Sequence, residues 1–223
     1  TSAASTAFCA EQLYGPGGLS LWLDGNGKIT RDNGTLDDPK PNAFSLLSQG
    51  GEDKAGRPGT HCPGATPTCI ASCYVDGLAK NAGDTYDLYR HNSGAIREIL
   101  ADRLLADAWA LCFAHWISQN VSSFRWHVSG DVFSLEYAQW IADVCLETPN
   151  VEHWIYTRSF AFLEPLVRVS TLRGRNLSVN LSCDKDNYEV ARRASGLWLS
   201  RLVGTGRLRL CYLTRDGEVP KNL

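Results

Sequence analysis

The sequence predicts an α/β fold in the form of a partial (βα) barrel, and three observations support this. The chain has 223 residues, 43% hydrophobic and 21% charged, a composition that supports an ordinary globular core. From residue 123 onward, short strand-like runs alternate with amphipathic helical runs, which is typical of a parallel sheet. The first ninety residues are instead punctuated by Gly, Pro, Asn and Asp, which predicts an irregular N-terminal region.

The N-terminal third offers few regular elements. We expect an irregular segment over residues 1–42, followed by the barrel over 43–223. Short strands are predicted at Ser20–Leu23 and Ala43–Leu47, and residues 50–77 read as one long loop. A loop of that length inside a compact domain usually serves a function.

The longest helix is predicted over residues 94–120. Its apolar side chains recur at the three- and four-residue spacing of one helical face. They are Ile96, Ile99, Leu100, Leu104, Ala108, Leu111, Cys112, His115 and Trp116. On this pattern His115 and Cys112 are expected to be core residues.

Strands and helices alternate after this helix. The predicted strands are residues 123–129, 152–157, 177–182 and 207–213, and the predicted helices between them are residues 135–147, 162–171 and 188–201. Eight complete units typically need about 250 residues, so the chain predicts a partial barrel of five or six strands.

In parallel α/β folds, functional residues gather at the carboxyl ends of the strands. Each predicted strand here is followed by a polar triplet. These triplets are Ser129-Gly130-Asp131, Thr157-Arg158-Ser159, Ser182-Cys183-Asp184 and Thr214-Arg215-Asp216. We therefore expect the functional site at this edge.

The clearest chemical motif is a cysteine loop over residues 61–74. Cys62, Cys69 and Cys73 lie within twelve residues at C-x6-C-x3-C spacing, with His61 directly before them. Thiolates on a Gly/Pro loop select zinc, copper(I) or an iron–sulfur cluster. Zinc usually takes four ligands, so three cysteines favour iron–sulfur, with zinc and a plain buried-cysteine loop as alternatives.

Four segments of the sequence together resemble a known family. They are residues 62–74, which end on Tyr74, residues 127–134, residues 154–159 and residues 176–182. Over residues 43–185 the chain resembles the phage family called gene product eighty-eight, as radical-SAM-like iron–sulfur proteins. The resemblance implies a partial TIM-like barrel of the radical SAM type and a cluster, expected to be [4Fe-4S], ligated by Cys62, Cys69 and Cys73. It also implies that Gly130 and Asp131 stand where such enzymes bind S-adenosylmethionine.

The sequence departs from the radical SAM pattern in ways that bear on function. The usual cysteine spacing is C-x3-C-x2-C, and Ser129-Gly130-Asp131 replaces the usual Gly-Gly-Glu segment. Cys183 follows a strand and could supply a fourth thiolate, which would close the cluster to S-adenosylmethionine. We therefore expect electron transfer or redox sensing with an unknown redox or protein partner. A radical SAM enzyme and a zinc-stabilised binding module remain the alternatives.

Other side chains near the strand ends have simpler interpretations. Asp131 could equally cap the helix that begins near Ser134. His127 reads as a hydrogen-bonded core histidine, and Arg158 as one half of an ion pair at the rim. Cys112 and Cys145 fall in helical patterns and read as packing residues.

Composition limits the partners. The net charge of −2 does not by itself predict nucleic-acid binding. Seven arginines of the second half could contact phosphates if they shared one face, although a solvated surface is favoured; they are Arg173, Arg175, Arg192, Arg193, Arg201, Arg207 and Arg209. The sequence shows no run that could span a membrane and no secretory signal pattern, so we expect a cytoplasmic protein, in the host cytoplasm if phage-encoded.

Overall fold

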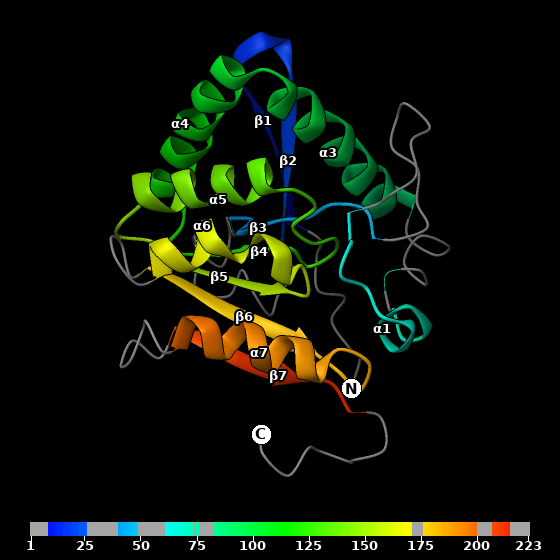
Figure 1. The fold of residues 1–223 in the computed structure, drawn as a ribbon. Helices are drawn as coiled ribbons and strands as arrows, with labels where there is room; N and C mark the ends of the chain where they lie inside the picture. The colour runs from blue at the N-terminus through cyan, green and yellow to red at the C-terminus, as the bar shows by residue number, and fades with distance from the viewer. Residues whose placement is uncertain are drawn as a thin grey trace, which may run out of the picture.

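The computed structural model describes residues 9–25, 40–48, 61–73, 75, 83–170, 176–199 and 207–214. Across these residues the fold is one open, mixed seven-stranded sheet (Figure 1). The strands are β1 (Cys9–Tyr14), β2 (Ser20–Gly25), β3 (Ala43–Phe44), β4 (Ser123–Trp126), β5 (Glu152–Thr157), β6 (Leu177–Cys183) and β7 (Leu208–Tyr212).

The order of the strands in the sheet equals their order in the chain. The three N-terminal strands pair antiparallel, and β3 to β7 pair parallel. The sheet is open in the part of the chain that the structure describes, so a closed barrel is not shown. What the sequence predicted correctly is the α/β class and the parallel run of strands.

The region expected to be largely irregular, residues 1–42, contributes two of the seven strands: β2 confirms the strand predicted at Ser20–Leu23, whereas β1 was not predicted. β1 and β2 form an antiparallel hairpin across the single-turn 3₁₀ helix η1 (Pro16–Gly18), and β2 then pairs with β3. Leu21 and Leu23 point into the core and are fully buried. The strand missed here is β1, whose sequence CAEQLY has no clear alternation of apolar and polar residues.

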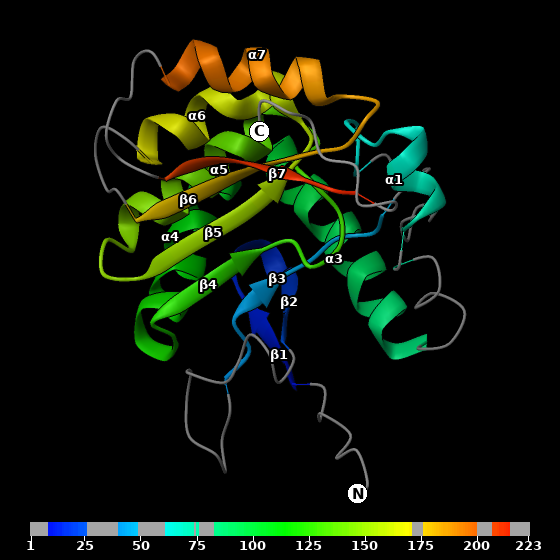
Figure 2. The same ribbon diagram turned by 90° about the horizontal axis from the view of Figure 1, so that it is seen from below.

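The helices form a second layer beside the sheet. They are α1 (Pro67–Ala71), α3 (Gly83–Ala101), α4 (Arg103–Asn120), α5 (Leu135–Glu147), α6 (Leu163–Arg168), preceded by the 3₁₀ helix η2 (Phe160–Phe162), and α7 (Tyr188–Leu199). Figure 2 shows α4 to α7 on one face of the sheet and α1 at the carboxyl-terminal edge of its strands. None of the described helices is long and apolar enough to cross a membrane.

The single long helix predicted over residues 94–120 is wrong in detail, because two helices meet at Asp102. The Asp102 carboxylate accepts a hydrogen bond from Leu105 N at 3.1 Å and so begins α4 as its N-cap. The break rotates α4 relative to the expected face: Trp109 and Phe113 are fully buried, whereas Leu104 is 80% exposed. His115, expected in the core, is exposed for the same reason.

Strand β4 ends three residues earlier than expected because of His127. This residue has φ of +63°, which is uncommon for a side chain with a Cβ. Its N–H donates to Phe44 O at 2.9 Å, and its Nε2 lies 2.8 Å from the Tyr137 hydroxyl, so the surrounding contacts hold the conformation. The turn sends the chain across the strand edge toward Gly130 and Asp131.

Candidate functional site

The cysteine loop lies at the carboxyl-terminal edge of the parallel strands, where the site was expected. Thr66 caps the short helix α1, and its Oγ1 accepts a hydrogen bond from Cys69 N at 3.0 Å. Gly64 packs directly on the backbone carbonyl of Arg158, the residue after β5, so closely that a Cβ would overlap it. This segment therefore requires glycine.

A buried network of polar side chains holds the loop in place. Thr66 Oγ1 donates to Asp184 Oδ2 at 2.6 Å, and Arg158 Nη1 lies 2.6 Å from the same oxygen. Arg158 N donates to Asp131 Oδ2 at 2.8 Å. The network thus joins the ends of β5 and β6, the turn after β4, and the loop. It confirms that Arg158 forms an ion pair, which is buried rather than at an open rim.

A second anchor holds the start of α1. The N–H of Thr68 donates to Asp186 Oδ2 at 2.9 Å, and Asp186 N donates to Asp184 Oδ1 at 2.9 Å. The turn between β6 and α7 therefore helps to fix the cysteine loop. Its carboxylate, from Asp186, stabilises an N–H group at the start of α1, where such groups lack partners within the helix.

The three loop cysteines form no disulfide and are of intermediate exposure. Burial raises the pKa of Cys69; Arg158 opposes the rise, while Cys73 and the two network carboxylates add to it. Cys69 lies in α1, whereas Cys73 follows the C-cap Ser72, and the two thiols are near enough for Cys73 to raise the pKa of Cys69. Among the described residues, however, no three His, Cys, Asp or Glu side chains are grouped as a metal site.

Thiols are the donors that a thiophilic metal prefers, and this anchored loop carries three of them. Metal ligation would also replace the thiol protons, which the carboxylates near Cys69 otherwise help to retain. The ligand assignment of Cys62, Cys69 and Cys73 stays a prediction.

Gly130 and Asp131 have clear local roles. Gly130 has φ of +82°, and a Cβ there would lie 2.7 Å from Leu46 Cβ. Asp131 is buried, and its Oδ1 accepts a hydrogen bond from Val132 N at 2.7 Å. Burial raises the pKa of Asp131, and hydrogen bonds from Thr157 and from Arg158 N oppose the rise. The cap of α5 is Ser134, not Asp131. Binding of S-adenosylmethionine at Gly130 and Asp131 remains a prediction.

Cys183 ends β6 inside the core and is fully buried. Its thiol donates to Cys211 O at 3.6 Å, a weak bond to the neighbouring strand. Burial raises the pKa of Cys183; Arg158 lowers it, while Asp184 and Cys211 raise it. Cys183 thus lies beside the anchoring network, and its role as a fourth ligand stays a prediction.

A histidine beside the loop has partners that sequence reasoning missed. His61 is fully buried, and its Nε2 accepts a hydrogen bond from Arg97 Nε at 3.1 Å. The Arg97 guanidinium lies 4.7 Å from the Phe133 ring centroid, and His61 meets the same ring edge-on at 5.1 Å. Arg97 and Phe133 come from α3 and the turn before α5, so no local pattern could reveal the cluster.

The burial of three further side chains shows which of them are core residues. His127 is a buried, hydrogen-bonded core histidine as expected, and burial lowers its pKa to about 3. Cys145 is fully buried in the core, whereas Cys112 is only half-buried. Tyr74, Arg173, Arg175, Arg201, Arg215 and Asp216 lie outside the described residues.

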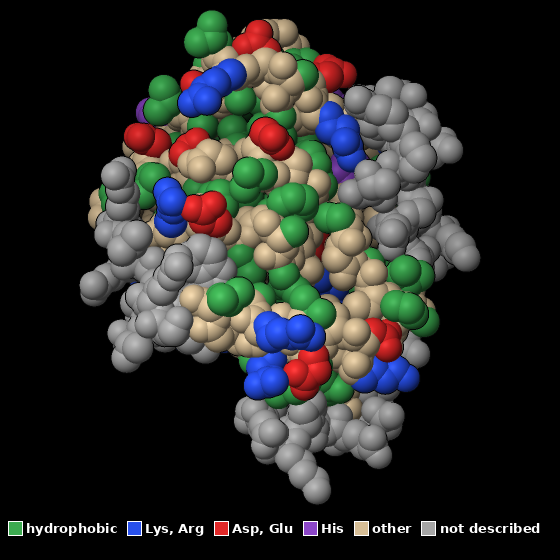
Figure 3. Space-filling model, viewed as in Figure 1, with side chains coloured by type: hydrophobic (Ala, Val, Ile, Leu, Met, Phe, Trp, Pro, Cys, Tyr) green, Lys and Arg blue, Asp and Glu red, His purple; other side chains and the backbone are tan. Residues whose placement is uncertain are grey.

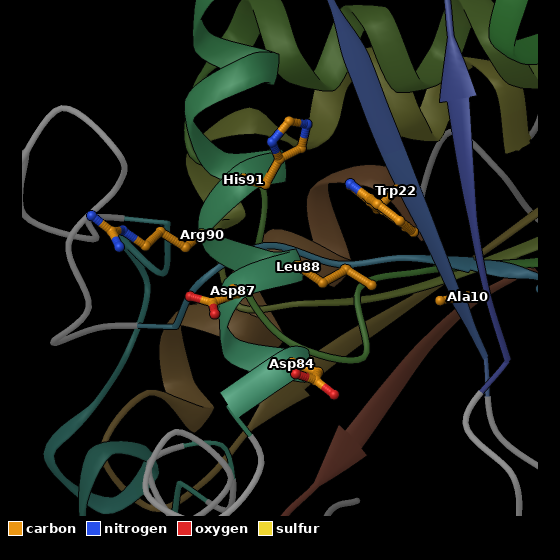
Figure 4. Close-up of a pocket in the computed structure, with 7 residues that line it drawn as sticks. All are labelled: Ala10, Trp22, Asp84, Asp87, Leu88, Arg90 and His91. Atoms are coloured by element: carbon orange, nitrogen blue, oxygen red, sulfur yellow. The ribbon is translucent and has the colours of Figure 1, made fainter.

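A separate cavity of about 500 Å³ opens between the β1–β2 hairpin and α3 (Figure 4). Trp22 and Ala10 line it from the hairpin, and Asp84, Asp87, Leu88, Arg90 and His91 line it from the helix. His91 is engaged there, with Nε2 2.9 Å from Ser20 O. None of the residues predicted to be functional lines this cavity.

Comparison with known proteins places the chain among phage sequences. A profile of the family described as Gene product 88 matches residues 20–199. The chain is 32% identical to the Gene 88 protein of Mycobacterium phage L5 over 143 residues, which is 60% of this chain and 56% of that protein. It is 30% identical to the Gene 88 protein of Mycobacterium phage D29 over 145 residues, 62% of this chain and 58% of that one. It therefore spans a little over half the length of these relatives, and no solved structure matches it significantly.

Proposed function

The chain belongs to the phage Gene product 88 family, and from that premise we propose that it binds an iron–sulfur cluster through Cys62, Cys69 and Cys73. The observation that carries this proposal is the placement of the loop. It bears three cysteines that form no disulfide and is fixed at the carboxyl-terminal edge of a parallel sheet. Soft thiolate ligands on such a loop suit iron–sulfur chemistry.

The buried network gives the loop the rigidity that a cofactor site needs. Thr66 and Gly64 are held by Asp184 and by the Arg158 carbonyl, so the backbone between Cys62 and Cys69 is attached to two strands. Ligands held by such supporting contacts bind more tightly than ligands on a loose loop. When bound, the cluster would supply one-electron redox chemistry.

Electron transfer or redox sensing suits this site better than radical SAM catalysis. The SAM alternative would need the Asp131 carboxylate to meet an ammonium group. Asp131 is instead buried, and its two oxygens accept hydrogen bonds from Val132 N and Arg158 N. These contacts already use the carboxylate within the fold.

Metal analysis tests the proposal directly. Iron, acid-labile sulfide and zinc are measured per chain on protein purified without oxygen, for the parent chain and for Cys62→Ser, Cys69→Ser and Cys73→Ser. Near-stoichiometric iron and sulfide, lost in each of the three variants, is the expected result.

The matched control is Cys112→Ser, which alters a half-buried cysteine on α4 and should keep the cluster. Zinc without sulfide would replace the proposal with a zinc-stabilised module. Equal cluster content in all four variants would overturn the ligand assignment.

A further inference from the structure

Strands β4 to β7 have two different faces. Along each strand the side chains alternate, and one set is buried under the helices: Phe124, Trp126, Ile155, Val179, Leu181 and Leu208. The opposite set, which we call the open sheet face, includes the half-buried Arg125 and Trp154, the exposed Tyr156 and Arg209, and the buried Asn180. Figure 2 shows helices α4 to α7 on the other side of these strands, within the part of the chain that the structure describes.

The strand register places these side chains next to one another. Arg125 on β4 is paired with Trp154 on β5. Tyr156, two residues further along the same face, is paired with Asn180 on β6, which is paired with Arg209 on β7. Two aromatic residues therefore follow one another on this face of β5, with Arg125 on the neighbouring strand β4 and Arg209 two strands away on β7.

The aromatic side chains are accessible. Tyr156 is 44% exposed and Trp154 is half-buried, although both lie on β5, which has a neighbouring strand on each side. The Arg125 guanidinium lies 5.8 Å from the Tyr156 ring centroid, and its Nε donates to His127 O at 3.2 Å. Tyrosine and tryptophan are enriched at binding interfaces, so two accessible rings on one face of a strand suit a surface used for binding.

The charges of this face favour an anion. Arg125 and Arg209 flank the rings, and Arg207 at the start of β7 is paired with Glu152 through a bidentate contact. Asp24, near Arg125, is buried and already accepts a hydrogen bond from Ser45. On the helical face, by contrast, acidic and basic side chains are interspersed (Figure 3).

We propose that the open sheet face binds single-stranded nucleic acid, with bases stacked on Trp154 and Tyr156 and phosphates contacted by Arg125 and Arg209. Exposed aromatic rings on a sheet, flanked by arginines, are what single strands require, because every base offers a face for stacking. The seven arginines seen in the sequence do not share one face, since Arg192 and Arg193 lie on α7. The proposal goes beyond cluster binding and is tested independently of it.

The experiment measures binding of fluorescein-labelled 15-mer oligonucleotides by anisotropy, using the full chain. DNA and RNA single strands and a DNA duplex are compared over a series of salt concentrations. The variants are Tyr156→Ser and Arg209→Ala, both at exposed positions, and the matched control is Arg192→Ala on α7. Circular dichroism confirms that each variant is folded, and the iron content of each is measured in parallel.

Tyr156→Ser should weaken single-strand binding by about tenfold. Arg209→Ala should reduce the slope of log affinity against log salt by about 1, while Arg192→Ala leaves it unchanged. The comparison of the DNA with the RNA single strand shows which nucleic acid binds more tightly. No binding, equal binding by all three variants, or equally tight binding of the duplex would overturn the proposal. If Tyr156→Ser and Arg209→Ala contain as much iron as the parent chain, a negative result in this experiment concerns the open sheet face and not the cysteine site.

Discussion

The guanidinium of Arg158 lies 2.6 Å from the carboxylate of Asp184, and both side chains are almost completely excluded from water. The ion pair joins the ends of two neighbouring strands, β5 and β6. Asp184 also receives the Thr66 hydroxyl, so the same carboxylate fixes the cysteine loop. A buried pair of this kind is strongly destabilised when one partner is removed.

Arg158→Met should therefore lower the free energy of unfolding by about 3–5 kcal/mol, because it leaves the Asp184 charge buried without its partner. Urea unfolding measures this change. Arg192→Met is the matched control, since the Arg192–Glu189 pair is more than half exposed and should contribute about 0–1 kcal/mol. Similar losses in both variants would contradict a special role for the buried pair.

His153 makes stability fall in acid. Burial lowers the pKa of His153 to about 3, against 6.5 when the chain is unfolded. Its contribution to stability is therefore complete above pH 6.5 and is lost as the pH falls toward 3, because the unfolded chain binds the proton first.

In His153→Gln, the slope of unfolding free energy against pH should decrease by about 1.4 kcal/mol per unit between pH 4 and 6. Urea titrations at several pH values measure the slope. Adding His127→Gln should decrease it by a similar amount again, since burial also lowers the pKa of His127 to about 3. An unchanged slope would show that neither residue is held neutral by burial.

Asp24 affects the dependence of unfolding free energy on pH in the opposite direction to His153. Burial raises its pKa from 3.8 to about 6, although hydrogen bonds from Ser45 and Tyr89 oppose the rise. The folded chain holds this proton more tightly, so the stability that Asp24 contributes is complete below pH 3.8 and is lost as the pH rises through 6.

Asp24→Asn should therefore gain stability relative to the parent by about 2–3 kcal/mol between pH 4 and pH 7. The measured quantity is the difference in unfolding free energy between the two proteins at each pH. Asparagine can still accept the Ser45 hydrogen bond, so packing is little changed. A difference that does not vary with pH would refute the prediction.

Gly64→Ala should displace the cysteine loop. A Cβ at this position overlaps the backbone carbonyl of Arg158, which cannot move without shifting β5. We expect a loss of about 1–3 kcal/mol in stability and faster reaction of the loop thiols with a maleimide reagent.

Gly196→Ala is the control, because Gly196 lies in α7 with open space around its Cα. Alanine should stabilise that helix by about 0.4–1 kcal/mol. Thiol labelling that is equal in the two variants would mean that Gly64 does not hold the loop.

Much of the second half of the fold could be predicted from the sequence. The bounds of α5 and β5 coincide with the predicted segments because each has a strong apolar period and a clear boundary. The helix over residues 94–120 failed because Asp102, a polar residue within a helical pattern, caps a new helix whose buried face differs. Periodicity alone does not detect such a change of face.

In the candidate site, too, some features could be predicted from the sequence and others could not. The position of the cysteine loop and the ion pairing of Arg158 followed from strand ends and residue chemistry. The contact between His61 and Arg97 joins residues 36 positions apart, and the pair of Thr66 with Asp184 joins residues 118 apart. Such contacts depend on how the strand ends converge, and a single sequence contains no local trace of them.

The strand order of the sheet has a consequence for how the chain reaches its structure. From β4 to β7, every strand pairs with the strand made just before it. A ribosome releasing this chain therefore presents each βα unit to a neighbour that is already complete. Domains tend to fold as the chain emerges, and pairings close in sequence form fastest. The last of the described strands, β7, then pairs with β6, and this pairing places Arg209 beside strands that are already paired.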